Sequence, residues 1–236
     1  MLKEPLIQMA ENQKDDKVSK PTMKANWCYL IPLVCTLVMG CSMVGFVIVG
    51  NNQVGGILAE KLDWEDKAKT YNTAISSWGI SGLIIGSFAV GPLLKVISRR
   101  SVIILTSLIC ALAVLPTIIL NLWAILLGKF IFGLAAGGLI VASSIYMNET
   151  IPAEHSSTFG FAINFGVISG IMLCLLIGAG LPDPADDPQA AKDDSFYMVI
   201  NLIPTVIGCL NILLWLCFFR LESLKSCMPV SRESTP

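Results

Sequence analysis

The chain is 236 residues long, with 54% hydrophobic residues, only 14% charged residues and a net charge of −1. A soluble domain carries about 25% charged residues, so this composition excludes an ordinary soluble protein, and the near-neutral charge gives no support for nucleic-acid binding. Eight cysteines without a C-x-x-C pair and a single histidine form no metal-site pattern. We expect an integral, multi-pass membrane protein in a lipid bilayer, with no metal or other cofactor; the composition points to no particular membrane.

Six apolar segments follow one another along the chain, each near the 20 residues that cross about 30 Å of hydrocarbon. The segment before them, residues 1–26, mixes lysines with acidic residues, which is typical of a disordered tail and not of a signal peptide. The segment after them, residues 220–236, is a second polar tail. The predicted transmembrane helices are 27–50, 73–94, 101–120, 123–147, 159–181 and 196–219. The predicted fold class is therefore all-α, a bundle of six transmembrane helices over residues 27–219.

Lysine and arginine are divided unevenly between the two sides of this predicted bundle. Eleven of the sixteen lie on the side of the N-terminus, in the first tail, in the turn 95–100 and after residue 219. Four lie in the loops of the opposite side, and Lys129 lies within a span. Because cytoplasmic segments carry the excess of Lys and Arg, both termini are predicted to be cytoplasmic.

Glycines recur at a spacing of four within three of the predicted spans. Small residues at this spacing let helix backbones approach closely in lipid, where hydrophobicity does not drive helices together. Three such pairs indicate a tightly packed bundle and not an open pore. The predicted packing glycines are Gly82 and Gly86, Gly133 and Gly137, and Gly166 and Gly170.

Lys129 is the only charge deep within a predicted span. Its long side chain either snorkels towards the membrane surface or contacts another helix or a substrate. No Asp or Glu lies in the middle of any span, so a proton relay would lack its usual titrating group. The sequence thus favours passive transport over proton-coupled transport.

The fourth span carries the first of three motifs that resemble a known family. It reads GKFIFGLAAGGLIVASSIYMNETIP, which is similar to the fourth helix of the sugar-porter branch of the major facilitator superfamily. The matching positions are Gly128, Lys129 (in place of Arg), Gly133, Gly137, Tyr146, Glu149, Ile151 and Pro152. The resemblance implies the N-terminal six-helix half of a sugar transporter.

Two further motifs lie at the predicted cytoplasmic ends of other spans. The turn after the second span resembles the superfamily's GxLxDRxGRR at Gly91, Leu93, Arg99 and Arg100, and Leu221 to Lys225 resembles the family's PESPR at Glu222 and Ser223. In the family these motifs form a cluster of salt bridges that holds the inner face closed. The resemblance implies this role for Arg99, Arg100, Glu149, Glu222 and Lys225.

The resemblance also indicates where a substrate would bind. The sugar-contacting glutamine of the family's fifth helix falls on Asn164, whose amide offers one acceptor and two donors. Asn52 and Gln53, at the outer end of the first span, and Lys129 complete the predicted substrate-binding residues. The chain departs from the family at Lys95, Val96 and Ser98, where the signature has Asp, Arg and Gly, and at Val47, where proton-coupled members have Asp.

A complete sugar porter has twelve helices in two halves, with the substrate held between them. The first hypothesis is that this chain is a half-carrier for sugars or polyols, which works by alternating access as a homodimer or with a second six-helix chain. A second is a transport-inactive scaffold subunit of a larger complex, and a third is a fragment of a full-length carrier. No catalytic constellation indicates an enzyme.

Overall fold

The computed structural model describes residues 27–64, 67–151, 159–181 and 197–227, without the side chains of residues 27–29, 118, 197 and 218–227. The predicted tails, residues 1–26 and 228–236, lie outside the described residues. Every element within the described part is helical: α2 (Trp27–Lys61), α3 (Ala68–Val96), α4 (Arg99–Ala113), α5 (Leu115–Ile118), α6 (Leu122–Thr150), α8 (Ala162–Gly178) and α10 (Tyr197–Cys227).

Five helical segments of the described chain are long and apolar enough to cross a membrane. They lie in α2, α3, α4 with α5, α6 and α10. Helix α8 is apolar but has only 17 residues, about 26 Å at 1.5 Å per residue, against a hydrocarbon core of about 30 Å. The chain is therefore an all-α, multi-pass membrane bundle, and the sixth span and the side on which the termini lie remain predictions.

Two helices extend well beyond the predicted spans. Helix α2 passes residue 50 and continues to Lys61, where Asp63 ends the run with a φ of 47°, the left-handed conformation that commonly follows a helix. Helix α10 continues to Cys227, so its last turns belong to the stretch 220–236 that was predicted as a tail. Apolarity marks only the part of a helix that lies in lipid, and the polar ends of α2 and α10 carry no such signal.

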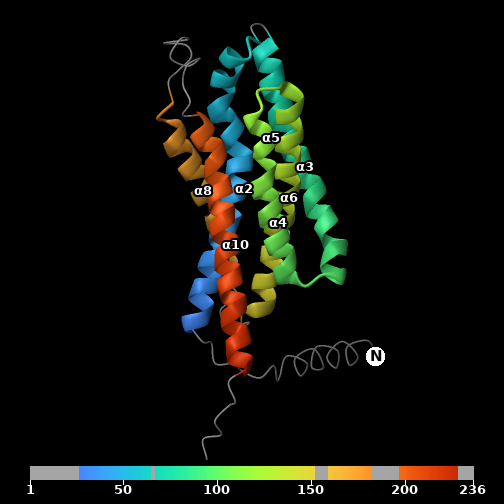
Figure 1. Ribbon diagram of the computed structural model, residues 1–236, viewed down its shortest axis with the longest axis vertical. Coiled ribbons are helices and arrows are strands. Elements are labelled where there is room, and N and C mark those ends of the chain that lie inside the picture. Colours follow the sequence, from blue (N-terminus) through green and yellow to red (C-terminus); the bar gives the residue numbers. More distant parts are fainter. Residues whose placement is uncertain (1–26, 65–66, 152–158, 182–196, 228–236) are drawn as a thin grey trace, which may run out of the picture.

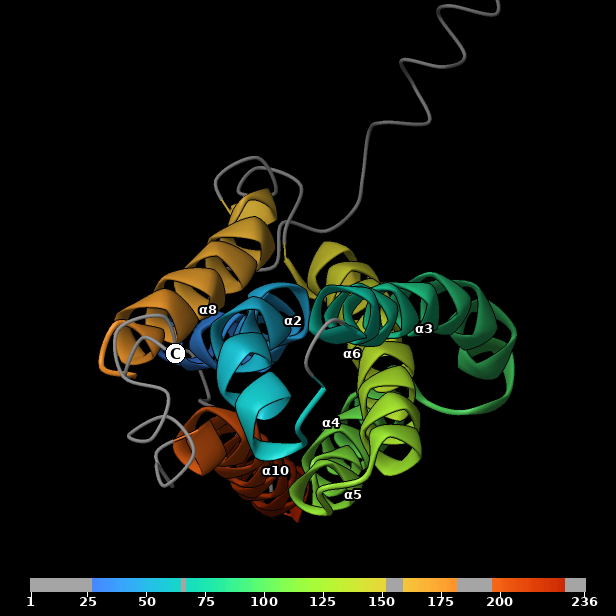
Figure 2. The same cartoon turned by 90° about the horizontal axis from the view of Figure 1, so that it is seen from above.

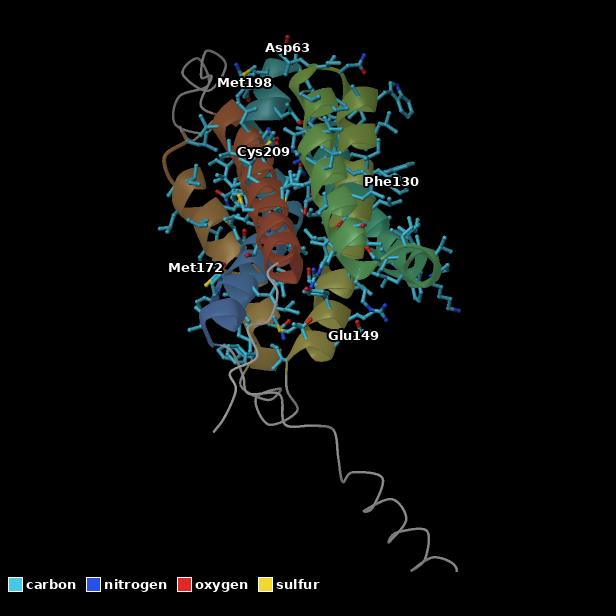
Figure 3. The ribbon with its side chains drawn as sticks, turned by 60° about the horizontal axis from the view of Figure 1, so that its bottom comes forward. Asp63, Phe130, Glu149, Met172, Met198 and Cys209 are labelled. Atoms are coloured by element: carbon cyan, nitrogen blue, oxygen red, sulfur yellow. The ribbon has the colours of Figure 1, made fainter. Side chains whose placement is uncertain are left out.

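The long helices run side by side along one axis, and α2 begins at the same end at which α10 finishes (Figure 1). Asp63 lies at the opposite end of the bundle from Glu149 (Figure 3). We refer to these as the Asp63 end and the Glu149 end; the predicted topology makes them the outer and cytoplasmic ends. Seen along the bundle, α8 lies against α2, and α3 lies against α6 (Figure 2).

The α3–α6 contact is the most extensive in the described chain, and glycines form it from both sides. A methyl group built on Gly82 or Gly86 of α3 would overlap the carbonyl oxygen of Phe130 or Leu134 in α6. Methyl groups built on the α6 glycines would in turn overlap carbonyl oxygens of α3. These reciprocal overlaps involve Gly133 with Gly79 and Gly137 with Leu83. The two helices are thus held at a distance that only glycine permits.

The α2–α8 contact is built in the same way. Methyl groups on Gly166 and Gly170 of α8 would overlap the carbonyl oxygens of Val38 and Ser42 in α2, and Gly45 of α2 lies equally close to the α8 backbone. Two tight helix pairs, α3–α6 and α2–α8, therefore frame the bundle. Helix α10 packs against α2 and α4 and closes the remaining side.

A buried asparagine joins three helices inside this frame. Asn211 of α10 is fully buried, and its Nδ2 donates to the carbonyl oxygen of Thr36 in α2 at 2.7 Å. Its Oδ1 accepts from the Ser107 hydroxyl of α4 at 3.2 Å. Helix α2 also passes close to this side chain, because a methyl group built on Gly40 would lie 2.9 Å from Asn211 Nδ2. A polar group in an apolar core must be paired, and here the pairing fixes α10 relative to α2 and α4.

Candidate functional site

Two arginines and a glutamate meet at the Glu149 end. Helix α3 stops at Val96, two extended residues follow, and Arg99 is the first residue of α4. Arg99 forms an ion pair with Glu149, near the last turn of α6. Each charge lies at the helix end where the helix dipole disfavours it, a cation at an N-terminus and an anion at a C-terminus. Pairing the two offsets both penalties.

Arg100 takes a different partner, the phenol of Tyr146. Its Nε donates to the Tyr146 hydroxyl oxygen at 2.8 Å, and its guanidinium carbon lies 5.6 Å from the centre of the Tyr146 ring. The same ring packs edge-on against Trp215 of α10, with 5.4 Å between ring centres. Arg100 of α4 is therefore connected to α10 through Tyr146 of α6. The first link is the arginine–tyrosine contact and the second is the contact between the Tyr146 and Trp215 rings.

The remaining predicted members of the salt-bridge cluster lie in the last turns of α10. Glu222 and Lys225 belong to the helical backbone, but their side chains are outside the described residues. The described part of the cluster is thus one ion pair and one arginine–tyrosine contact. Because Arg99 and Glu149 are 42% and 46% exposed, their pair is worth about 0–1 kcal/mol.

Charge-reversal variants should show that Arg99 and Glu149 stabilise the protein as a pair. Arg99→Glu or Glu149→Arg alone brings two like charges together and should lower the stability of the purified chain by up to about 1 kcal/mol; the double variant restores the pair with each charge at the helix end that favours it and should be at least as stable as the unchanged chain. Thermal unfolding in detergent, compared across the four proteins, measures the coupling. Lys95→Glu, which reverses an exposed cation in the last turn of α3, serves as the control: it loses the favourable interaction with that helix end, and its effect should add to that of Glu149→Arg without coupling. A double variant no more stable than the sum of the single ones would contradict a coupled pair.

Lys129, on α6, faces into the bundle. Its Nζ donates to Asn201 Oδ1 of α10 at 3.4 Å, across a cavity of about 10 Å³ that Phe46, Thr117 and Phe132 also line. A cavity of this size is at the lower limit for one water molecule and cannot hold a sugar. Lys129 therefore contacts a neighbouring helix and does not extend its side chain towards the membrane surface.

Asn52 lies at a separate place, in a polar cleft between the Asp63 ends of α2 and α3. The cleft has a volume of about 430 Å³. Asn51, next to it, is buried and donates to the carbonyl oxygen of Asn72 at 3.1 Å and to the Ser76 hydroxyl at 2.8 Å. Asn72 Nδ2 in return donates to the carbonyl oxygen of Gly55 at 3.0 Å. These amides fix the spacing of the two helices on which the cleft depends.

The structure does not gather the predicted substrate-binding residues into one site. The Gln53 side chain packs against the backbone of α8 at Gly178 and not in the cleft. Asn164 is exposed near the start of α8, 14 residues before Gly178 and so about 21 Å nearer the Glu149 end. Asn52, Gln53, Lys129 and Asn164 thus occupy four different surroundings, and their role in substrate binding remains a prediction.

Sequence reasoning missed three polar groups that the structure makes prominent. These are the Asn51–Asn72 exchange, the Asn211 contacts and the Tyr146–Trp215 contact. The signal that could have found Asn211 is its position within the apolar segment 196–219, where an unpaired amide is costly. Asn51 and Asn72 lie just outside the predicted spans and carry no such signal, and the sequence marks Tyr146 only as a motif residue.

Comparison with known proteins agrees with the motifs. The sequence model of the sugar (and other) transporter family matches residues 35–220. Hexose transporter 1 of Plasmodium falciparum is 22% identical over 76% of this chain, and probable plastidic glucose transporter 1 of Arabidopsis thaliana is 30% identical over 68%. Facilitated trehalose transporter Tret1 of Drosophila willistoni is 32% identical over 44%.

The chain is much shorter than these relatives. It covers 38% of the Plasmodium protein, 30% of the Arabidopsis protein and 12% of the Drosophila protein. All three are named as transporters and none as an enzyme. The match nevertheless extends over most of this chain and includes all the described helices from α3 to α8. The chain belongs to the sugar (and other) transporter family, the sugar-porter branch of the major facilitator superfamily.

Proposed function

We propose that the chain is one six-helix half of a carrier that moves sugars or similar polyols across a membrane. The observation that carries the proposal is the family match over residues 35–220, joined to relatives named for hexose, glucose and trehalose transport. The six spans, with both termini in the cytoplasm, follow from the distribution of Lys and Arg. Residues 1–26 and 220–236 would then belong to the cytoplasmic side.

The proposed mechanism is alternating access between this half and a second one. Six spans return both termini to one side, so two parallel copies related by an axis along the membrane normal could surround a common path. The Arg99–Glu149 pair and the Arg100–Tyr146 contact would then hold the Glu149 end closed while the Asp63 end is open. One exposed ion pair is weak, so the latch would act through the cluster as a whole.

Transport by this half would be passive. No Asp or Glu lies in the middle of a described helix, and Lys129 contacts the amide of Asn201 and not a carboxylate. A proton-coupled carrier needs a group that gains and loses a proton as the path opens to each side. We therefore expect uptake that follows the sugar gradient and persists when a protonophore collapses the proton gradient.

Uptake of labelled glucose by cells without their own hexose carriers tests the function. Cells that express the chain should show saturable uptake, and Asn164→Ala should reduce its efficiency about 2- to 10-fold, the equivalent of one lost hydrogen bond. Asn164→Gln, which restores the amide of the family, should retain uptake. Asn148→Ala removes an equally exposed helical asparagine from α6 and is the matched control.

The possible results of the uptake assay test three claims separately: the role of Asn164, transport by this chain alone, and the passive mechanism. Saturable uptake that is unchanged in Asn164→Ala would remove Asn164 from the path but leave the transport function. Absence of uptake from a chain that reaches the membrane folded would count against autonomous transport. Uptake abolished by the protonophore would contradict the passive mechanism.

The alternative function, a transport-inactive scaffold, rests on two departures from the family, one of which is Ser156-Ser157 in place of the Arg-Gly that follows the fourth helix. The signature aspartate is replaced by Lys95, which is exposed in the turn that carries the cluster. The native mass of the complex distinguishes the two functions. A particle of two 25.4 kDa chains, or of this chain with a second six-helix chain, supports a carrier. A large particle of unrelated subunits supports the scaffold.

A further inference from the structure

The cleft between α2 and α3 is an open groove with the volume of a small-molecule site. Its volume of about 430 Å³ lies within the range of about 300–1,000 Å³ that small-molecule sites occupy. It opens near the Asp63 end and is lined by residues of α2 and α3. Hydrogen bonds of Asn51 and Asn72 between these two helices hold them at a fixed spacing.

The lining of the cleft is rich in hydroxyl and amide groups. The Thr73 hydroxyl donates to the carbonyl oxygen of Lys69, and the Ser77 hydroxyl to that of Thr73, both at 2.8 Å. With their hydrogens engaged, both hydroxyl oxygens are left as hydrogen-bond acceptors. Asn52 and Lys69 are exposed at the same cleft and supply donors.

One acceptor in the wall of the cleft is unsatisfied. Asn72 Oδ1 is buried and has no hydrogen-bond partner among the described residues. An unpaired buried acceptor costs about 1–3 kcal/mol. Because Oδ1 has almost no accessible surface, a solute in the cleft does not reach it, and the Asn72 amide serves to position the two helices and not to bind.

The polar lining belongs to a surface that faces water. Lys69, Thr73 and Ser77 are spaced by four, so they lie on one face of α3, which continues with the exposed Ser81 and then with the apolar Ile84 and Phe88. The face is therefore polar in its half nearer the Asp63 end. Lys69 and Asn52 lie just outside the predicted spans 73–94 and 27–50, so this end of the face meets water at the membrane surface.

We propose that this cleft is a polyol-binding subsite on the outer side of the half-carrier. Thr73 and Ser77 accept hydrogen bonds from the hydroxyl groups of a sugar, and Asn52 and Lys69 donate to its oxygens. The subsite lies about 20 Å along the bundle from Asn164, so it would hold a sugar before or after the central path does. The subsite rests on the proposed function, because sugars are taken as the ligand, but a sugar can bind there even if this chain alone does not transport it.

Cysteine labelling in native membranes tests the subsite directly. Ser77→Cys and Thr73→Cys are made in the full chain, and membrane-impermeant methanethiosulfonate ethyltrimethylammonium is applied from the outer side. Both cysteines should react, and glucose at about ten times its Kd should slow the reaction about tenfold, because about one cleft in eleven stays empty. Glycine betaine at equal osmolality should not slow it.

Two controls define the background. Lys67→Cys is exposed at the start of the same helix but does not line the cleft, so it should react at the same rate with and without glucose. The unmodified chain, with its exposed Cys35, Cys209 and Cys217, gives the rate of the native thiols. Circular dichroism of each purified variant checks that the helices are retained.

The results bear differently on the two proposals. Glucose protection of Ser77→Cys without any uptake supports the subsite and rejects the transport function. Uptake with cysteines that react but are not protected rejects the subsite alone. Cysteines that react only after the membrane is dissolved in detergent face lipid, and this result would also overturn the subsite.

Discussion

Replacing Gly86 by leucine is expected to separate α3 from α6 and to cause the largest loss of folded protein among single glycine variants. The first carbon of any side chain at this position would overlap the carbonyl oxygen of Leu134, which is backbone and cannot rotate away. Forcing extra atoms into a packed interface typically costs about 1–3 kcal/mol, and more where backbone must move. The Tm of the purified chain in mild detergent, followed by tryptophan fluorescence, measures the loss.

Gly91→Leu is the matched control for this variant. Gly91 lies five residues further along the same helix, and apart from its chain neighbours, Pro92 among them, nothing is within 4 Å of a methyl group built there. The substitution should therefore lower the Tm much less than Gly86→Leu, and any loss comes from the ring of Pro92, which disfavours a side chain on the helical residue before it. Equal effects of the two variants would mean that the α3–α6 contact does not depend on glycine.

Asn211→Leu is expected to loosen α10 from the rest of the bundle. The substitution keeps the branching and the number of heavy atoms but leaves the buried Ser107 hydroxyl without its partner and removes the hydrogen bond to Thr36. Interhelical hydrogen bonds in membrane proteins contribute about 0.6 kcal/mol on average, and an unpaired buried group adds about 1–3 kcal/mol. A loss of about 1–3 kcal/mol, measured by the same thermal unfolding, is the expected result.

The double variant Asn211→Leu with Ser107→Ala separates these two contributions. Removing the stranded hydroxyl should recover part of the loss, so the double variant should be more stable than the sum of the single variants predicts. Asn164→Leu, which changes an exposed helical asparagine, should leave the Tm unchanged. Additive losses in the double variant would show that the two side chains do not act together.

Much of the fold could be predicted because the bilayer constrains it strongly. Apolar length located the helices, and the spacing of Gly82 and Gly86 indicated a close helix contact. It could not indicate the partner, because a G-x-x-x-G pair looks the same whichever helix it meets. The structure pairs α3 with α6 and α2 with α8, neighbours in space that are not neighbours in sequence.

The candidate site could be predicted only in part. The family pattern pointed to Arg99 and Glu149, which form an ion pair, but gave no partner for Arg100, which contacts Tyr146. Spacing along a helix also does not decide which of two adjacent amides faces a cleft. Asn52 is exposed at the α2–α3 cleft, whereas Gln53, the next residue, turns towards α8.

The close pairing of α2 with α8 has a consequence for how the protein is made. Gly45 and Gly170 are 125 residues apart, so at about 5–20 residues per second the first helix waits about 6–25 s for its partner to be synthesised. The α3–α6 pair, from Gly86 to Leu134, can form within less than half that time. We therefore expect the α3–α6 pair to form before the α2–α8 pair, so that the glycine face of α2 stays without its partner until α8 has been synthesised.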